Sequence, residues 1–216
     1  MKFLVTAGPT REPIDPVRYL SNRSSGKMGY AVAEAAVKQG HDVTLISGPV
    51  HLNPPEGCEL VSVTTAEEMF HAVMAHINFV DVAILVAAVA DFRPAEYASE
   101  KIKKDSGAPI IHLVPTKDIL AELGRVADRK FLLIGFAAET QDVENNAIQK
   151  LERKRCDLIV GNDVSLTGKG FESDHNAVIY VAPHGIIGKS GERTKHEIAQ
   201  HLVKKSEELY TKKFSE

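Results

Sequence analysis

The chain of 216 residues is 44% hydrophobic and 25% charged, with a formal net charge of −3 at pH 7. These are values of ordinary globular proteins and give no reason to expect a nucleic-acid partner, so any anion site must come from a local cluster of Lys and Arg. Cys58 and Cys156 lie far apart without a C-x-x-C pattern, which argues against a disulfide framework or a zinc site. No signal peptide and no continuous apolar stretch of about 20 residues is visible, so we expect a cytoplasmic chain that does not enter a membrane.

Short apolar runs alternate with segments of helical period along the chain. We expect strands at 3–5, 43–46, 82–86, 131–136 and 158–160 and helices at about 26–39, 66–77 and 141–154, followed by a hairpin over 177–187 and a last helix at about 193–210. Gly40 is expected just past the end of the first helix. Strands that alternate with helices predict an α/β, Rossmann-like doubly wound fold with a mostly parallel sheet, in a single domain spanning 1–216.

The stretch from Phe92 to Lys117 fits this alternation poorly. It carries prolines, a lysine cluster and one short apolar run, 110–114. We interpret residues 92–117 as an inserted flap or arm, because such elements commonly close over ligands or pair between subunits.

The turn after the first strand lacks the G-x-G-x-x-G fingerprint of a nicotinamide-binding fold. The strand is followed by a polar loop, 11–23, and then by Ser24, Ser25, Gly26 and Lys27 at the expected start of the first helix. Serines there cap free backbone N–H groups and the exposed helix N-terminus attracts anions, while glycines let a phosphate approach the backbone. The alternative is a plain serine cap with packing glycines.

Asn22 precedes this segment. Its side chain can present an N–H group to a developing oxyanion. The alternative is an asparagine that stabilises a turn.

Asp91 follows the small residues 87–90 at the carboxyl end of the expected buried strand 82–86. Ligands of open α/β sheets bind at that edge, where small side chains leave room for a flat base or a sugar. Asp91 is therefore a candidate for binding a ligand or a magnesium-bound triphosphate, or else an N-cap. Ten residues on, Lys101, Lys103 and Lys104 form either an anion clamp or a solvated charge run.

Lys150 and Lys154 lie beside and within the apolar stripe of the helix expected over 141–154. Two like charges one turn apart repel weakly, which an anion at this face would offset. The alternative is that both lysines extend outward into solvent from the last helical turn.

Taken together, these segments resemble the phosphopantothenoylcysteine synthetase family. The stretches that carry the resemblance occur in family order over nearly the whole chain: TAGPTREPIDPVRYLSNRSSGKMG from Thr6, SGP from Ser47, AAVADFRP from Ala87, KIKK from Lys101, GFAAET from Gly135, K-x-x-x-K at Lys150, DLIVGNDV from Asp157 and F-x-S-D-x-N from Phe171. The family implies a homodimer and a two-step ligation. The 4′-phosphopantothenate carboxylate attacks the α-phosphate of CTP, with Mg²⁺ accompanying the nucleotide, and the cysteine amine then displaces CMP.

The resemblance also implies roles for single residues. It assigns nucleotide binding to Ala87, Asp91, Lys101, Lys117, Asp118, Ile119, Leu120, Phe136, Lys150 and Lys154. Asn22 matches a position that handles the acyl intermediate, which suits an oxyanion donor, and Lys101 suits stabilisation of charge at the α-phosphate. No flavin is expected, and the chain resembles a stand-alone form without the fused decarboxylase.

Two points leave details of the resemblance open. Many bacterial members carry Asn-Pro-Asp-Ile where this chain has Thr116-Lys117-Asp118-Ile119, so the contacts of this loop with the nucleotide stay open. Animal members use ATP, so the choice between CTP and ATP stays open as well.

Two other classes of protein compete with a ligase: a nicotinamide oxidoreductase on the same fold, and a nucleotide sensor without catalysis. The missing fingerprint disfavours the first, and Asn22 and Lys101 disfavour the second.

Overall fold

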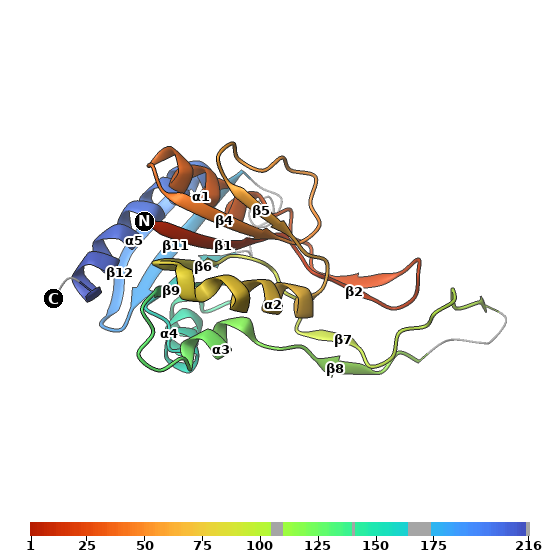
Figure 1. The fold of residues 1–216 in the computed structure, drawn as a ribbon. Coiled ribbons are helices and arrows are strands. Elements are labelled where there is room, and N and C mark those ends of the chain that lie inside the picture. The colour runs from red at the N-terminus through yellow and green to blue at the C-terminus, as the bar shows by residue number, and fades with distance from the viewer. Residues whose placement is uncertain (105–109, 140, 164–173, 215–216) are drawn as a thin grey trace.

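An eight-stranded sheet lies at the centre of the fold in a computed structural model that describes residues 1–104, 110–139, 141–163 and 174–214 (Figure 1). Its strand order is β12 (Gly185–Thr194), β11 (His175–Ala182), β10 (Leu158–Asp163), β9 (Leu132–Glu139), β6 (Val82–Leu85), β1 (Lys2–Ala7), β4 (Asp42–Ser47) and β5 (Glu59–Ser62). The six strands from β10 to β5 pair in parallel, and β11 and β12 pair antiparallel at the edge. The mostly parallel doubly wound sheet is confirmed.

Helices cover both faces of this sheet. On one face α1 (Lys27–Lys38) and α5 (Lys195–Phe214) pack over a buried cluster that contains Phe3, Leu45 and Ile134. On the other face α2 (Ala66–His76), α3 (Ile119–Gly124) and α4 (Val143–Lys154) pack over a second cluster, and a short 3-10 turn, Ile77–Phe79, follows α2. Fully burying one Leu or Ile contributes about 1.5–3 kcal/mol, so these two layers hold the sheet in place.

The chain changes direction across the sheet beside β1. It runs from β1 outward through β4 to β5, then returns to β6 on the other side of β1 and continues outward to β9 and β10. The carboxyl ends of β1 and β6 therefore form the topological switch point, where open α/β sheets bind their ligands.

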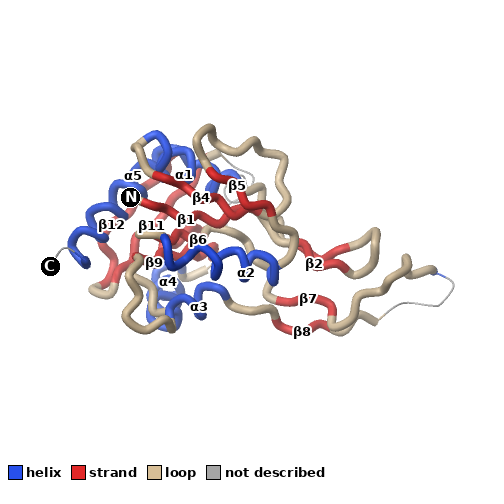
Figure 2. Tube along the Cα trace, in the orientation of Figure 1, coloured by secondary structure: helices blue, strands red, loops and turns tan. Residues whose placement is uncertain are grey.

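Two small antiparallel sheets extend away from the central sheet (Figures 1 and 2). One pairs β2 (Arg11–Pro13) with β3 (Tyr19–Ser21), and the other pairs β7 (Phe92–Pro94) with β8 (Leu113–Pro115). The expected loop over 11–23 is thus a hairpin. The arm, residues 92–117, contains a two-stranded extension, and its residues 105–109 lie outside the described residues. In the described part of the chain no helix is long and apolar enough to cross a membrane.

Several local expectations were wrong. The N-cap of α1 is Gly26 with a φ of 78° and no side-chain cap bond, so neither serine occupies the N-cap position. Asp91 precedes strand β7 and caps no helix. Strand β5 and helix α3 were not expected, and β12 extends well past Ile187 because its pairing with β11 continues to Thr194. Gly40, with a φ of 83°, does follow the end of α1 as expected.

Candidate functional site

A cavity of about 580 Å³ opens at the carboxyl ends of β1 and β6. Its lining consists of residues from five parts of the chain: Thr6, residues 85–91 and 116–120, Phe136 and Ala138, and Lys150, Arg153 and Lys154. Of the ten residues expected at a nucleotide site through the resemblance, all except Lys101 line this cavity. The switch-point topology brings these distant segments to one place.

The strand end at 86–90 is held by hydrogen bonds from its neighbours. The N–H of Ala88 donates to the carbonyl of Gly8 at 2.9 Å, and the N–H of Ala90 donates to Oγ1 of Thr10 at 2.9 Å. Thr116 donates from Oγ1 to the carbonyl of Ala90 at 2.6 Å. Small side chains on a fixed backbone leave open space there, and the exposed Asp91 lies at its rim.

Helix α4 brings two ammonium groups to the cavity wall. Lys150 donates from Nζ to the carbonyl oxygen of Phe136 at 2.7 Å, and Lys154, whose side chain is only 13% exposed, pairs with Asp118. Burial lowers the pKa of Lys150. Both side chains therefore line the cavity, and neither extends outward into solvent as the alternative interpretation required.

The segment 116–120 forms the start of α3. Asp118 is the N-cap of this helix and accepts a hydrogen bond from the N–H of Ala121 at 2.9 Å. Burial alone would raise the pKa of Asp118, but the Lys154 ammonium and the Ala121 N–H outweigh it and lower that pKa. Lys117 lies over the ring of Phe70 at 4.5 Å from its centroid. Although the Asn-Pro-Asp-Ile pattern is absent, Asp118 caps a helix at the cavity wall.

A second, smaller cavity of about 60 Å³ lies at the start of α1 and shares Val86, Phe136 and Ala138 with the first. Its lining also includes Gly8, residues 24–29, Ala137, Asn162, Asn176 and Lys195. The Oδ1 atoms of Asn162 and Asn176 are buried, and within the described ranges they have no hydrogen-bond partner. Burial, together with the nearby charge of Lys27, lowers the pKa of Lys195 to about 8.

Asn22 lies between the β2–β3 hairpin and the strand end of the first cavity. Its Nδ2 donates to the carbonyl oxygens of Ala88 and Val89, both at 3.1 Å. Two acceptor carbonyls fix the orientation of the amide, so both of its hydrogens are used here and Oδ1 points elsewhere. An oxyanion donor role, which stays a prediction, requires one of these hydrogens to turn toward the substrate.

Lys101 is exposed on the arm and lies outside the lining of both cavities. The next residue, Ile102, is bound through its backbone to Asp15 and Arg18 of the β2–β3 hairpin. The structure thus places Lys101 beside a fixed backbone position and away from the other expected nucleotide ligands.

No cluster of three or more His, Cys, Asp or Glu side chains suited to a metal occurs in the parts of the chain that the structure describes. Asp91 and Asp118 are the carboxylates at the first cavity, and Asp118 is already paired with Lys154. Magnesium usually keeps several waters and binds through one or two carboxylates plus substrate phosphates. Among the described residues that line this cavity, Asp91 is the carboxylate that fits that mode.

Sequence reasoning missed several residues of the two cavities. Arg153 and Thr116 line the first, and Asn162, Asn176 and Lys195 line the second. A signal was present for Asn162, because it follows the buried run 158–160 and so lies near the carboxyl end of its strand. Lys195 belongs to a helix whose start was expected two residues earlier. Phe171 and Ser173 of the F-x-S-D-x-N stretch, Thr140 and Val164 lie outside the described residues.

Residues 1–209 match the protein family described as the DNA/pantothenate metabolism flavoprotein C-terminal domain. The coenzyme A biosynthesis bifunctional protein CoaBC of Vibrio parahaemolyticus serotype O3:K6 (strain RIMD 2210633) is 47% identical over 209 residues, which cover 96% of this chain and 52% of that protein. The protein of the same name from Bacillus subtilis (strain 168) is 51% identical over 176 residues, covering 81% and 43%. The chain spans about half the length of these curated relatives.

A crystal structure of the C-terminal domain of CoaBC has the same fold. It superposes with a TM-score of 0.82 at 44% identity, over 96% of this chain and 94% of that one. A structure described as the DNA/pantothenate metabolism flavoprotein from Streptococcus pneumoniae superposes equally well, with a TM-score of 0.82 at 25% identity. The overall fold is therefore shared with these proteins.

Proposed function

Because the chain belongs to the family of the DNA/pantothenate metabolism flavoprotein C-terminal domain, we propose that it is a phosphopantothenate–cysteine ligase of coenzyme A biosynthesis that uses CTP. The observation that carries this proposal is the pair of adjoining cavities that share Val86, Phe136 and Ala138. A ligase that activates one substrate with a nucleotide must hold both side by side, with the reacting atoms near the common wall.

The larger cavity takes CTP. Its strand end, 86–90, offers space for a flat base and sugar, and Lys150, Arg153 and Lys154 supply positive charge for the triphosphate. The smaller cavity takes one end of 4′-phosphopantothenate, which combines a phosphate with hydroxyl and amide hydrogen-bond donors. The buried Lys195 suits the anion. The Oδ1 atoms of Asn162 and Asn176, which have no partner among the described residues, suit the donors.

Activation is the first step. A carboxylate oxygen of 4′-phosphopantothenate attacks the α-phosphorus of CTP, the bond from that phosphorus to the bridging oxygen breaks, and pyrophosphate leaves. The product is an acyl-cytidylate. Negative charge builds on the α-phosphate during this step, and Lys101 supplies an ammonium to stabilise it when the arm lies over the nucleotide. Mg²⁺ accompanies the triphosphate, with Asp91 as the carboxylate that fits it.

Ligation is the second step. The amine nitrogen of cysteine attacks the acyl carbon, the bond from that carbon to the phosphate oxygen breaks, and CMP leaves as the amine loses a proton. Charge builds on the acyl oxygen, and the amide of Asn22 is the neutral donor assigned to it. Asn22 bonds to the strand end that lines the nucleotide cavity, so it lies at the right edge for this task.

The chain is proposed to act as a homodimer through its two extensions. Large apolar side chains on them are strongly exposed: Val17 at 61%, Tyr97 at 55% and Ile110 at 84%. Two extended hairpins with little core of their own would bury such side chains against a second copy.

The decisive experiment follows pyrophosphate release with CTP, 4′-phosphopantothenate and cysteine, and with each omitted in turn. We expect continued turnover only with all three, and an amide product of the mass of the two acids joined with loss of water. Release that does not depend on the two acids would contradict a ligase. A nucleotide-dependent absorbance change with NADH in place of CTP would support the oxidoreductase instead.

A further inference from the structure

A third cavity, of about 500 Å³, meets the first cavity at Asn22. Asn22 lines the third cavity, while its Nδ2 donates to the carbonyl oxygens of Ala88 and Val89, which line the first. Pro9, another residue of the third cavity, forms a parallel bridge with Ala88. Only this thin wall separates the third cavity from the strand end beside which the acyl carbon must lie in the proposed function.

The third cavity also adjoins the second. The two share Ser24, Ser25 and Lys27 at the start of α1. In the proposed function the first cavity takes CTP and the second takes one end of 4′-phosphopantothenate, so cysteine is the substrate without an assigned site. The third cavity has a wall in common with both assigned sites, as the site of a third reactant must.

Positive charge dominates the lining of the third cavity. The described residues that line it include three cations, Arg11, Arg23 and Lys27, and no Asp or Glu. Lys27 is balanced by an ion pair with Asp174 at 2.7 Å. None of the ion pairs among the described residues involves the guanidinium of Arg11 or of Arg23. Positive charge without a counter-ion on the same wall favours binding of an anion.

Arg11 is the most firmly placed of these cations. Its backbone N–H donates to the carbonyl of Thr64 at 2.7 Å, and its guanidinium lies over the ring of Tyr19, 4.7 Å from the centroid. In the pairing of β2 with β3, Arg11 lies opposite Ser21, the residue directly before Asn22. The hairpin therefore carries the guanidinium close along the chain pairing to the residue proposed to act on the acyl oxygen.

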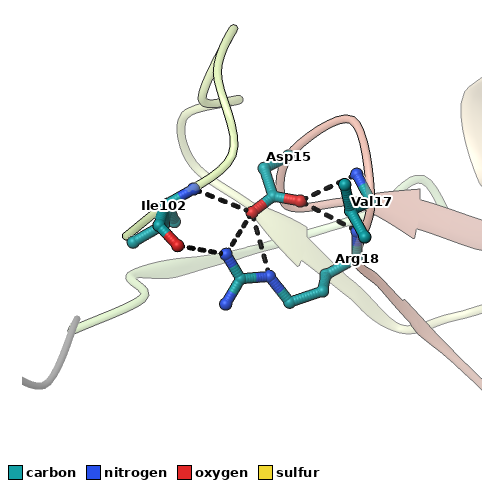
Figure 3. Close-up of polar contacts among 4 residues, drawn as sticks. All are labelled: Asp15, Val17, Arg18 and Ile102. Atoms are coloured by element: carbon teal, nitrogen blue, oxygen red, sulfur yellow. Dashed lines mark hydrogen bonds and ion pairs between the residues drawn. The ribbon is translucent and has the colours of Figure 1, made fainter. Parts of the chain in front are cut away.

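The β2–β3 hairpin, which carries this guanidinium, is held at both ends. At its turn the buried carboxylate of Asp15 accepts the N–H groups of Val17 and Arg18, both at 2.8 Å (Figure 3). At its base Ser21 donates from Oγ to the carbonyl of Thr10 at 2.7 Å. Because the guanidinium starts from a fixed backbone and rests on an aromatic ring, little conformational freedom is lost when its planar fork binds a carboxylate.

Three apolar side chains, those of Pro49, Val50 and Leu52, add a different kind of wall to the third cavity. A Cβ atom on Gly8 or Gly26 would lie 2.9 or 2.8 Å from Cγ1 of Val50, so the two glycines let Val50 pack closely against the start of α1. A cysteine thiol packs as a small hydrophobic group with a weak S–H donor, and so suits this wall.

Two anionic groups of the substrates compete for a cationic cavity beside Asn22: the carboxylate of cysteine and the phosphate of 4′-phosphopantothenate. The carboxylate and the amine of cysteine are bonded to the same carbon atom, so an anchored carboxylate keeps the amine beside the acyl carbon. The phosphate and the reacting carboxylate of 4′-phosphopantothenate lie at opposite ends of that molecule. An anion site next to the acyl centre therefore fits cysteine.

We propose that the third cavity binds cysteine, with its carboxylate on the guanidinium of Arg11 and its thiol against Pro49, Val50 and Leu52, so that its amine faces Asn22. This inference rests on the proposed function, in which that amine attacks the acyl carbon. Arg11 then selects the second substrate and takes no part in activation. Cysteamine, which has the same amine and thiol without the carboxylate, gains nothing from Arg11.

The kinetic test forms the acyl-cytidylate in the full chain and chases it with cysteine or with cysteamine. The measured quantity is the second-order rate constant of transfer at low amine concentration, in the parent and in Arg11→Gln. We expect the constant for cysteine to fall by about 10- to 100-fold, as for one lost charge-assisted bond, and that for cysteamine by less than about threefold. Differences in basicity between the amines cancel, because each amine is compared between parent and variant.

Arg125→Gln is the matched control, since Arg125 forms an exposed pair with Glu122 away from the three cavities, and it should match the parent with both amines. Equal losses with cysteine and cysteamine in Arg11→Gln would show that Arg11 supports the fold of the site and does not bind the carboxylate. An unchanged constant for cysteine would overturn the proposal as well.

The activation step provides the second readout. The rate of acyl-cytidylate formation, followed against the concentration of 4′-phosphopantothenate, should stay within about twofold of the parent in Arg11→Gln. A higher requirement for 4′-phosphopantothenate would assign the cavity to its phosphate and overturn the cysteine site. A parent protein that forms no acyl-cytidylate at all would refute the proposed function and the cysteine site with it. An active parent with equal losses for both amines would refute only the cysteine site.

Discussion

The ammonium of Lys150 donates a hydrogen bond to the carbonyl oxygen of Phe136 at 2.7 Å, while that of Lys154, one helical turn later, pairs with Asp118. The two lysines thus differ in what they must give up to bind a triphosphate. Lys150 breaks a bond to a neutral carbonyl, whereas Lys154 competes with a carboxylate.

We therefore expect Lys150→Ala to weaken CTP binding more than Lys154→Ala does. Losing one charge-assisted hydrogen bond costs about 1.5–3 kcal/mol, or roughly ten- to a hundredfold in affinity. Calorimetric titration with CTP measures both, and Lys38→Ala, which removes an exposed pair with Glu34 on α1, is the control. The thermal unfolding midpoint should change little. Affinities equal to that of the parent in both variants would exclude a role for these lysines in nucleotide binding.

The pH dependence of CTP binding should report Lys150. Burial lowers the pKa of this lysine in the free protein, and a bound triphosphate raises it again because it favours the charged ammonium. Binding then takes up a proton in the pH range between the two values. Below the pKa of Lys150 in the free protein, the titration of this lysine does not change the affinity for CTP. Between that pKa and the higher pKa of the complex, the affinity for CTP falls as pH rises.

The measurement compares the Kd for CTP in the parent and in Lys150→Ala from about pH 6.5 to 9.5. Titration of the nucleotide itself affects both proteins alike and cancels in the ratio of the two Kd values. We expect the advantage of the parent over the variant to shrink toward high pH. A ratio that stays constant across the range would contradict the coupling.

The core of the fold was accessible from the sequence because buried strands and amphipathic helices carry strong periodic signals. The runs ending at Val86, Phe136 and Val160 all became neighbouring strands, and the carboxyl ends of the first two line the larger cavity. Strand β5 was missed because three of its four residues, including Leu60, are exposed and carry no clear alternation. The β2–β3 hairpin was missed because its fixed geometry comes from the buried Asp15 rather than from apolar residues.

The site was only partly accessible for a different physical reason. The lysines of α4 could be identified from their place beside an apolar stripe, which is a property of one helix. Asn162, Asn176 and Lys195 come from three elements, and only the pairing of β10 with the antiparallel strand β11 places the two asparagines beside the start of α5. The hydrogen bonds of Asn22 to the backbone at residues 88 and 89 likewise depend on tertiary contacts that no local pattern encodes.

The close approach of α1 to β1 predicts a large effect at Gly29. A Cβ atom on Gly29 would lie 2.5 Å from Cβ of Ala7 and 3.0 Å from the carbonyl oxygen of Thr6. We expect Gly29→Ala to reduce the free energy of unfolding by about 1–3 kcal/mol. The rate of ligation should also fall, because the first residues of α1 line the second cavity. Gly188→Ala is the control, because its Cβ would make an ordinary contact with Tyr180 at 3.6 Å. Urea unfolding measures the midpoints of both variants. Equal midpoints for Gly29→Ala and Gly188→Ala would contradict the close contact between α1 and β1.

Base selection gives another prediction. We expect kcat/KM for ligation to be about 100-fold higher with CTP than with ATP. A cavity that binds the hydrogen-bonding edge of one base leaves buried polar groups unpaired with another. We assign the binding of the base edge to backbone polar groups of two segments that line the cavity: the strand end at 86–90 and residues 116–120, where α3 begins. The two nucleotides are compared at equal magnesium, with UTP as a second pyrimidine. Equal values for CTP and ATP would show that the cavity does not distinguish the bases.

The last prediction concerns Asn22, whose amide donates to the carbonyls of Ala88 and Val89. In Asn22→Asp a carboxylate replaces the donor, and its charge repels both these carbonyls and any oxyanion that develops nearby. The strand end itself should hold, because the Ala88 N–H remains bonded to Gly8 and the Ala90 N–H to Thr10. CTP affinity should then change by less than about tenfold, the cost of one neutral hydrogen bond.

Transfer should suffer far more than activation. Removing an oxyanion donor costs on the order of 10²–10³ in rate, so we expect Asn22→Asp to form the acyl-cytidylate but to pass it to cysteine very slowly. A quench without cysteine, with the acyl-nucleotide identified by mass, measures the first step, and a cysteine chase measures the second. Lys101→Gln should fail earlier, before the intermediate accumulates, which separates the two residues in one experiment. If Asn22→Asp instead formed no intermediate and bound CTP poorly, its amide would serve to hold the strand end rather than to stabilise the oxyanion.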